Sequence, residues 1–302
     1  MKVLILSSRE DRKIALDIKQ LCNSSGMEGD IYDNNTPCRG GFYSCLDNND
    51  LVLIIWNEKL LQEYEVVFTV GFCLGRKKPF AMFQSGNNAV PFCNGKAVKL
   101  SSEDELKIFI SRELEKNEKQ KSMEDARKMI HEMGLEIDLR DFIESVSEGK
   151  TIAVEQFLEA GFSADSCDRN GVSLLNIAVR KGHEQAAVLL IDAGADINTV
   201  SGDRGNTPVM DAAAEGNLSL LARLIDSGAK LDLRSKSGQT ALVLAVGRQA
   251  EEAALLLINS GADINIKDDL GMSAEKYAGL FKLQKVLSLM TEKADDSIFP
   301  SG

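Results

Sequence analysis

The sequence has little of what metal, membrane and nucleic-acid sites are built from. Its 302 residues include two histidines and six scattered cysteines, with no Cys-x-x-Cys pair, so we expect no zinc site. No apolar run reaches about 18 residues, the length needed for a helix that crosses a membrane. The net charge of −11 disfavours nucleic acid and anionic membranes as partners. We therefore expect a cytoplasmic protein with reduced thiols and no metal or tightly held cofactor.

The composition is that of ordinary globular material. Hydrophobic residues make up 44% of the chain and charged residues 27%, which allows a sizeable buried core. The length suggests about two domains.

Three segments between Gly171 and Asp269 repeat one pattern. Each opens with Gly-x-Ser or Gly-x-Thr, at Gly171, Gly205 and Gly238, and each closes with Gly-Ala. The opening glycines are separated by 34 and then 33 residues, an alanine follows each of them by seven residues, and a Leu-Ile pair precedes each closing glycine. A fixed period of this size predicts a stack of repeated units.

Each unit has the marks of two short helices. Ser173, Thr207 and Thr240 precede apolar runs and can cap the starts of the first helices. The alanine is small where a second helix must approach closely. The closing glycine can adopt the left-handed conformation that often ends a helix. Turn-forming residues then lead into a short extended finger.

The opening motifs resemble the ankyrin repeat, whose ideal form begins Gly-x-Thr-Pro-Leu-His. The copies read Gly-Val-Ser-Leu-Leu-Asn, Gly-Asn-Thr-Pro-Val-Met and Gly-Gln-Thr-Ala-Leu-Val. The family's histidine is absent from all three, so its hydrogen bond to the threonine can survive only between Asn176 and Ser173. The resemblance implies an all-α ankyrin-repeat solenoid over residues 141–290, with three full repeats between two caps. Residues 291–302 are expected to form a flexible tail.

The first section, residues 1–115, alternates apolar runs with helical segments. Its pattern predicts a flavodoxin-like, doubly wound parallel sheet with helices on both faces; the expected strands are Val3–Leu6, Gly29–Asp33, Leu51–Trp56, Pro79–Phe83 and Ala97–Leu100. Residues 116–140 are rich in Glu and Lys spaced for a helix, which predicts a helical connector. Its apolar stripe is expected to dock on the cap of the repeats; the stripe consists of Met123, Ala126, Ile130 and Met133.

Short motifs in this section resemble the Toll/interleukin-1 receptor (TIR-like) and nucleoside 2-deoxyribosyltransferase-like families. They are Ile5-Leu-Ser-Ser-Arg9, the loop 33–41, Asp50-Leu-Val-Leu-Ile54 and residues 70–79. In both families a glutamate on the long helix carries the glycosidic-bond chemistry, and the matching position here is Thr69. A threonine cannot act as a carboxylate nucleophile. Glu65, one helical turn earlier, is a substitute that requires accurate placement, so the resemblance favours a domain without catalysis.

A ligand site remains possible without catalysis. In open parallel sheets, ligands bind beyond the carboxyl ends of the strands, and that rule selects Ser7, Ser8, Arg9, Asp33, Trp56 and Asn57. A nucleotide or NAD would suit this set, with Arg9 on a phosphate and Trp56 on a base. The structural alternatives are that the two serines cap a helix and that Trp56 packs in the core.

The resemblance to ankyrin repeats assigns outward-facing variable positions to partner contact. Several of them are basic in an acidic protein, which favours an acidic protein surface as partner. The finger from Asn198 to Gly205 is one residue longer than its neighbours, and such departures often serve recognition. The candidates are Arg169, Asn170, Val172, Arg180, Lys181, Arg204, Asn206, Glu215, Lys236, Gln239, Arg248 and Asp269.

Two functions follow as hypotheses. The first is a protein-binding ankyrin module that carries a TIR-like domain for nucleotide sensing or self-association. The alternative is an N-glycosidase or deoxyribosyltransferase that acts on NAD or nucleosides and is regulated by the repeats.

Overall fold

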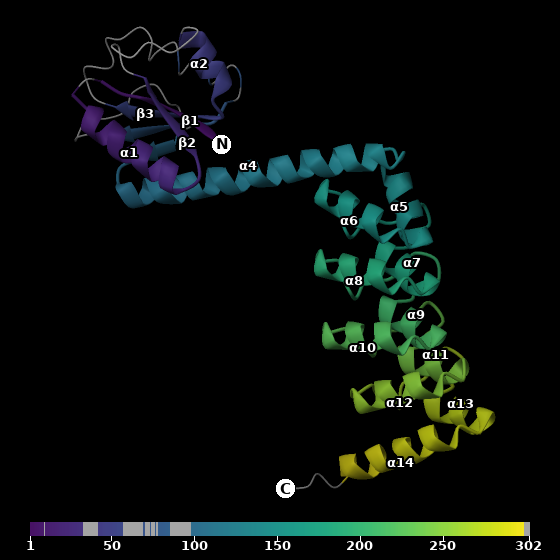
Figure 1. The fold of residues 1–302 in the computed structure, drawn as a ribbon. Coiled ribbons are helices and arrows are strands. Elements are labelled where there is room, and N and C mark those ends of the chain that lie inside the picture. The colour runs from purple at the N-terminus through teal and green to yellow at the C-terminus, as the bar shows by residue number, and fades with distance from the viewer. Residues whose placement is uncertain are drawn as a thin grey trace. The chain divides into compact units, whose positions relative to one another are not determined.

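The computed structural model describes residues 1–8, 10–32, 42–56, 69, 73, 76, 78–84 and 98–298. The chain divides into two compact units, Met1–Lys121 and Ser122–Gly302. A single helix, α4 (Glu103–Glu132), belongs in part to each unit (Figure 1). The first unit has a hydrophobic core on each face of its sheet, and the second unit has one core along its helices.

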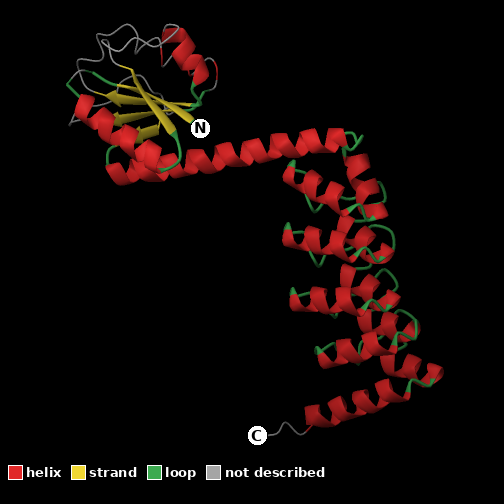
Figure 2. Cartoon of the chain, viewed as in Figure 1, coloured by secondary structure: helices red, strands yellow, loops and turns green. Residues whose placement is uncertain are grey.

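The first unit is built on a parallel sheet, drawn in yellow in Figure 2. Its five strands lie in the order β2-β1-β3-β4-β5. Every neighbouring pair is parallel, as short apolar runs joined by helical segments predict. The strands are β1 (Lys2–Leu6), β2 (Glu28–Tyr32), β3 (Leu51–Trp56), β4 (Phe80–Gln84) and β5 (Val98–Leu100).

Helices cover both faces of this sheet. Because side chains alternate along a strand, Val3 and Ile5 of β1 face α1 (Arg12–Ser24) and the first turns of α4. Leu4 lies in the core on the opposite face, with Leu46 of α2 (Phe42–Asn48). The expectation of a parallel sheet covered on both faces is therefore confirmed. Of the long helix predicted at 58–74, the structure describes only Thr69 and Cys73, both helical, and Arg76 beyond its predicted end is helical too.

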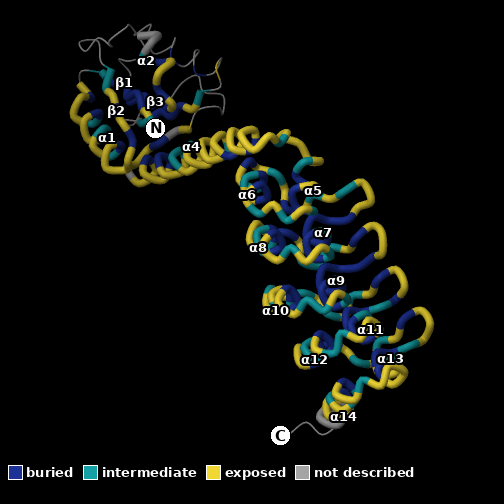
Figure 3. Tube along the Cα trace, turned by 45° about the vertical axis from the view of Figure 1, so that its right-hand side comes forward, coloured by how far each residue is buried: buried dark blue, intermediate teal, exposed yellow. Residues whose placement is uncertain are grey.

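The described part of the second unit contains five pairs of helices stacked side by side (Figure 1). The buried residues form a continuous band through the first helices of successive pairs (Figure 3). The pairs are α5 (Leu139–Glu148) with α6 (Thr151–Glu159), α7 (Leu174–Lys181) with α8 (Glu184–Asp192), α9 (Pro208–Glu215) with α10 (Leu218–Asp226), α11 (Ala241–Gly247) with α12 (Glu251–Asn259), and α13 (Ala274–Phe281) with α14 (Gln284–Ile298).

The repeated residues have the roles that their spacing predicts. Ala178, Ala212 and Ala245 are fully buried between the helices. Ser173 accepts a hydrogen bond from the Asn176 backbone at 3.2 Å and donates one to its side-chain oxygen at 2.8 Å. The predicted substitute for the family's histidine is therefore present in this repeat.

The second repeat lacks an equivalent bond. Met210 stands where Asn176 stands in the first repeat, and its sulfur accepts a hydrogen bond from the Thr207 backbone at 3.4 Å. The buried Thr207 hydroxyl has no hydrogen-bond partner among the described residues, which agrees with the absence of the family's histidine from this repeat.

The apolar stripe of the connector packs on the first helix pair. Ala126 and Ile130 of α4 are buried in the same core as Phe142 and Phe157. Met133, in contrast, lies beyond the end of α4 and is exposed.

The last helix differs from the sequence prediction. α14 continues to Ile298, so much of the predicted tail is helical. The reason is local, because residues 291–298 contain no glycine or proline to end the helix.

Candidate functional site

The fingers that precede the first helices of the repeats are fixed at their bases by short hydrogen bonds. A carboxylate serves in two of them: Asp168 Oδ1 accepts from the Val172 backbone, and Asp268 Oδ1 from the Met272 backbone, both at 2.9 Å. In the fingers between these two, serine hydroxyls serve instead. Ser201 Oγ accepts from the Asn206 backbone at 3.0 Å, and Ser235 Oγ from the Gln239 backbone at 3.2 Å.

The longer finger, residues 198–205, folds back toward the finger before it. The Gly202 N–H donates to the Gly171 carbonyl at 2.7 Å. A Cβ atom on Gly202 would lie 2.2 Å from the Asn170 carbonyl oxygen, so only glycine fits at this position. Lys236 of the following finger supports the fold from the other side, because its ammonium group donates to the carbonyls of Gly202 and Asp203.

Arg180 joins this finger to the first helices of two repeats. Its guanidinium contacts Asp203 at 2.6 Å and Asp211 at 2.7 Å, and it donates to Ser201 Oγ at 3.0 Å. Hydrogen bonding to Arg180 holds the pKa of Asp203 well below its usual value. Burial, which lowers the pKa of Arg180, is outweighed by the two carboxylates, so that pKa is raised.

The Asp211 carboxylate is buried and fully engaged. Besides Arg180, it accepts from Asn176 Nδ2 at 2.8 Å and from Asn206 Nδ2 at 2.7 Å. Donors from three places in the sequence thus surround one buried carboxylate, which compensates the cost of removing it from water. We call Asn176, Arg180, Asn206 and Asp211 the buried polar network.

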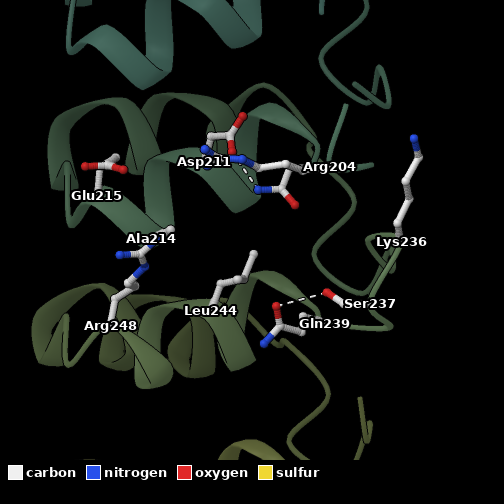
Figure 4. A pocket seen from close by; sticks show the side chains of 10 residues that line it. Arg204, Asp211, Ala214, Glu215, Lys236, Ser237, Gln239, Leu244 and Arg248 are labelled. Atoms are coloured by element: carbon white, nitrogen blue, oxygen red, sulfur yellow. Dashed lines mark hydrogen bonds between the residues drawn. The ribbon is translucent and has the colours of Figure 1, made fainter. Parts of the chain in front are cut away.

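A pocket of about 430 Å³ lies next to this network, between α9, α11 and the fingers that precede these helices (Figure 4). We call this side of the repeats the open face. Figure 4 shows Leu244 between Arg248 at the end of α11 and Gln239 at the base of the finger. Arg204 and Arg248 are exposed, and neither guanidinium has an ion-pair partner in the described part of the chain. The pocket is lined by Arg204, Asn206, Asp211, Ala214, Glu215, Lys236, Ser237, Gln239, Leu244 and Arg248.

Of the twelve residues that the sequence suggested for partner contact, ten either line the pocket or are exposed outside it. Half of the twelve line the pocket: Arg204, Asn206, Glu215, Lys236, Gln239 and Arg248. Four others are exposed outside it: Arg169, Asn170, Lys181 and Asp269. Asp269 pairs with Arg234 at 3.0 Å.

The expectation that all twelve face outward is wrong for three of them. Val172 is buried and Asn206 is 7% exposed, because the finger folds its opening residues against the helix that follows. Arg180 is held by two carboxylates of its own chain.

Sequence reasoning missed Asp211, Asp203, Ala214 and Leu244. A signal for Asp211 was present: Arg180 and Asp211 are 31 residues apart, close to the repeat period. Opposite charges at such a separation on neighbouring first helices predict a pair across two repeats.

The candidates of the first unit lie partly outside the described residues, as Arg9, Asp33, Asn57 and Glu65 do. Ser7 is buried at the carboxyl end of β1, and its hydroxyl has no hydrogen-bond partner in the part that the structure describes. Ser8 Oγ accepts from the Asp11 backbone at 3.3 Å and donates to Asp11 Oδ2 at 2.7 Å. Trp56 ends β3, and its side chain is outside the described part. Thr69 is helical and fully buried.

The described residues can also be compared with the expectations about metals, membranes and cysteines. Their histidines, cysteines and acidic residues form no cluster of three or more that could hold a metal ion. None of their helices is long and apolar enough to cross a membrane. Cys22, Cys73 and Cys167 are free thiols. The expectation that all six cysteines are reduced is wrong for Cys45, which is in a disulfide.

Comparison with known proteins identifies the repeats. Two models of the ankyrin-repeat family match, one to residues 170–201 and one to residues 200–268. A putative ankyrin repeat-containing protein of Treponema pallidum (strain Nichols) is 39% identical over 184 residues, which is 61% of this chain and 62% of that protein. Human neurogenic locus notch homolog protein 1 is 36% identical over 135 residues, 43% of this chain and 5% of its own length. The mouse B-cell lymphoma 3 protein homolog is 34% identical over 98 residues, 32% of this chain and 22% of its own length. The chain thus spans less than two thirds of each of these relatives, and its residues 170–268 are ankyrin repeats.

Proposed function

We propose that this protein binds a protein partner through the open face of its ankyrin repeats, with the α9–α11 pocket at the centre of the contact. The observation that carries the proposal is the pair of exposed arginines, Arg204 and Arg248, beside the half-buried Leu244. Arginine is enriched at protein interfaces and among the residues that dominate their binding energy.

The charge of the pocket favours an acidic partner surface. Arg180 pairs with both Asp203 and Asp211 and offsets one of their two negative charges. The lining residues contribute three basic side chains against the carboxylates of Glu215 and the buried Asp211, so the lining is basic in a protein whose net charge is −11. Such local charge steers an oppositely charged partner to the site and suppresses other partners.

Site-specific photo-crosslinking in the producing cell tests this proposal. We expect a discrete crosslinked protein when a photoreactive amino acid replaces Ser237, which lines the pocket. The matched control replaces Asp226, an exposed residue at the end of α10, the second helix of the repeat. The same adduct from both positions, or from neither, would contradict binding at this face.

A second function is proposed for the first unit: binding of a nucleoside-like ligand by a flavodoxin-like, TIR-like domain. The strand order and the parallel pairing of all neighbours support this domain class, whose ligands bind where the strand order reverses. The buried hydroxyl of Ser7, which has no hydrogen-bond partner among the described residues, lies at the carboxyl end of β1, beside β3. Since Asp11 already places a carboxylate at the start of α1, we favour a ligand hydroxyl over a phosphate there.

The variant Ser7→Ala tests the ligand site. It removes a buried hydroxyl for which the described residues supply no partner, so the protein without ligand should be as stable as the wild type or slightly more stable. A nucleoside that raises the melting temperature of the wild type should raise that of the variant less. Equal shifts for both proteins would exclude Ser7 from the site.

The alternative function, an N-glycosidase or deoxyribosyltransferase, requires a separate test. NAD or a deoxynucleoside is incubated with the full chain, and the released base is measured by chromatography. Release that disappears in Glu65→Ala would establish glycosidic-bond chemistry and displace the non-catalytic proposal. Self-association through the first unit also stays a proposal, and sedimentation of the full chain at several concentrations tests it.

A cytoplasmic location is likewise a proposal. The free thiols of Cys22, Cys73 and Cys167 support it, and the disulfide of Cys45 counts against it. Fractionation of the producing cells shows which compartment contains the protein. Alkylation during lysis traps the redox state of each cysteine, so the same experiment shows whether Cys45 is oxidised there.

A further inference from the structure

The α9–α11 pocket combines an apolar floor with basic groups on two sides. Leu244 and Ala214 are half-buried and contribute the apolar surface. Arg248 belongs to the helix side, at the C-terminal end of α11, and Arg204 belongs to the finger side. Figure 4 shows the Leu244 side chain projecting into the space between the two repeats.

The extra residue of the second finger accounts for part of this charge. Since Gly202 is bonded to the preceding finger, Asp203 next to it pairs with Arg180. Arg204 then lines the pocket with its guanidinium unpaired among the described residues. An acidic residue is thus withdrawn from the pocket and a basic one is presented to it.

Polar groups of the pocket lining are suited to a peptide backbone. Gln239 and Ser237 line the pocket and offer amide and hydroxyl groups that can donate or accept. A pocket of about 430 Å³ is within the range of small ligand sites, about 300–1,000 Å³, and accommodates a side chain with its flanking backbone.

We propose that this pocket selects a short extended segment of the partner in which one aliphatic side chain stands between two carboxylates. The aliphatic side chain packs on Leu244, while the carboxylates on either side reach Arg248 and Arg204. This inference rests on the proposed function, since it specifies the partner chemistry of the same face.

The carboxylate of Glu215 sets the limit of this selection. It lines the pocket together with the arginines and repels any group of dense negative charge. A segment with single carboxylates on separate side chains can contact the arginines and avoid Glu215. A polyphosphate or a nucleic-acid backbone, with a charge at every unit, cannot avoid it.

The test measures binding of labelled peptides to the full chain by fluorescence anisotropy at about 50 mM salt. The probe is Gly-Asp-Ser-Leu-Ser-Asp-Gly. One control peptide has glycine in place of leucine, and a second has amides in place of both acids. We expect the probe to bind about 10-fold more tightly than either control, because a desolvated aliphatic side chain and two charge-assisted contacts each have effects of this size.

Protein variants assign this preference to the pocket. Arg204→Gln with Arg248→Gln should reduce the preference for acids over amides to about 2-fold or less. Arg127→Gln with Lys128→Gln removes the same amount of charge from the exposed surface of α4 and should leave the preference unchanged. Thermal unfolding of each variant checks that the repeats remain folded.

Four outcomes would overturn the inference. They are equal binding of the acidic and amide peptides, equal binding of the leucine and glycine peptides, a preference for acids that survives loss of both arginines, and no binding of the probe at millimolar concentration. A crosslink at the position of Ser237 that persists in any of these cases would retain protein binding at this face and reject only the chemistry inferred here.

Discussion

Removing the Arg180 guanidinium should destabilise the repeats far more than removing an exposed arginine with the same contact distance. The informative change is Arg180→Met, because methionine keeps an aliphatic stem and loses only the charge and its donors. The control is Arg223→Met on α10, whose partner Asp192 lies at 2.6 Å. Contact distance is therefore matched. The two arginines differ in the burial of their partners and in the second carboxylate, Asp203, that Arg180 contacts.

The magnitude follows from that difference. The Asp211 side chain is 3% exposed, whereas those of Arg223 and Asp192 are 46% and 57% exposed. Removing one partner of a buried pair costs about 3–5 kcal/mol of unfolding free energy. Asp211 keeps its two asparagine donors, so we expect about 2–4 kcal/mol for Arg180→Met. For Arg223→Met we expect about 0.5 kcal/mol, the value of an exposed pair.

Urea unfolding followed by two signals measures this. The sequence has one tryptophan, Trp56, in the first unit, so its fluorescence reports on that unit. Far-ultraviolet circular dichroism reports mainly on the helices of the repeats. We expect the dichroism midpoint of Arg180→Met to fall while the fluorescence midpoint stays unchanged.

A double variant separates the pair from general disruption. With Asp211→Asn added, the buried charge is gone, and the summed cost of the two single changes should exceed the cost of the double change by about 1–3 kcal/mol. The reasoning is refuted if Arg180→Met is no more destabilising than Arg223→Met, or if the two changes are additive.

Further predictions concern single positions. Gly205 and Gly261 both have positive φ, but a Cβ on Gly205 would lie 2.7 Å from the Lys236 backbone nitrogen, whereas a Cβ on Gly261 would meet nothing within 4 Å. In urea unfolding, Gly205→Ala should therefore cost about 2–4 kcal/mol and Gly261→Ala about 1 kcal/mol. Equal costs would contradict the close contact at Gly205. The pKa of Asp203 is lowered in the folded protein, so its ionised form stabilises the fold above its unfolded pKa of about 4, and this stabilisation is lost as the pH falls through the folded value. The loss of unfolding free energy in Asp203→Asn, about 1 kcal/mol at neutral pH, should therefore become smaller below pH about 4. A loss that becomes larger in acid would contradict the lowered pKa. Burial raises the pKa of Cys73 to about 11, whereas Cys167 is exposed. Iodoacetamide should therefore label Cys167 in the native protein and Cys73 only after denaturation, as measured by peptide mass mapping. Labelling of Cys73 in the native protein would contradict its burial.

The positions that the sequence could identify are those whose role is decided by size alone. Ala178 and its counterparts must be small because two helices meet there, and every repeat needs the same small residue. Closing glycines such as Gly194 have positive φ, a conformation that favours glycine in each copy. A requirement that recurs in every unit produces a period in the sequence, and the period is visible without coordinates.

The buried polar network is not periodic, which is why it was missed. Asn176, Arg180 and Asp211 occur once each and satisfy one another across two repeats. Read one at a time, an arginine near the end of a helix is expected to be exposed and charged. Only the position of its partner on the next repeat makes it a structural residue, and that position depends on how the repeats stack.

In the first unit, the same distinction separates what was predicted from what was not. The alternation of Val3, Leu4 and Ile5 between two cores follows from strand geometry, so the sequence predicts it directly. That the buried Ser7 hydroxyl has no partner within the described ranges depends on what surrounds the end of β1. The sequence placed Ser7 at the correct edge of the sheet, and it could not distinguish a helix cap from an open donor.

The second finger shows how a visible irregularity can leave its consequence undetermined. The longer spacing between Gly171 and Gly205 reveals an extra residue, which could have extended the finger into solvent. It folds back instead, because Gly202 has no side chain to prevent its hydrogen bond to the finger before it. Asp203 can then meet Arg180. The charge of the pocket therefore depends on a backbone contact between two fingers, and arginines placed at the positions of Arg204 and Arg248 in a regular repeat would not reproduce it.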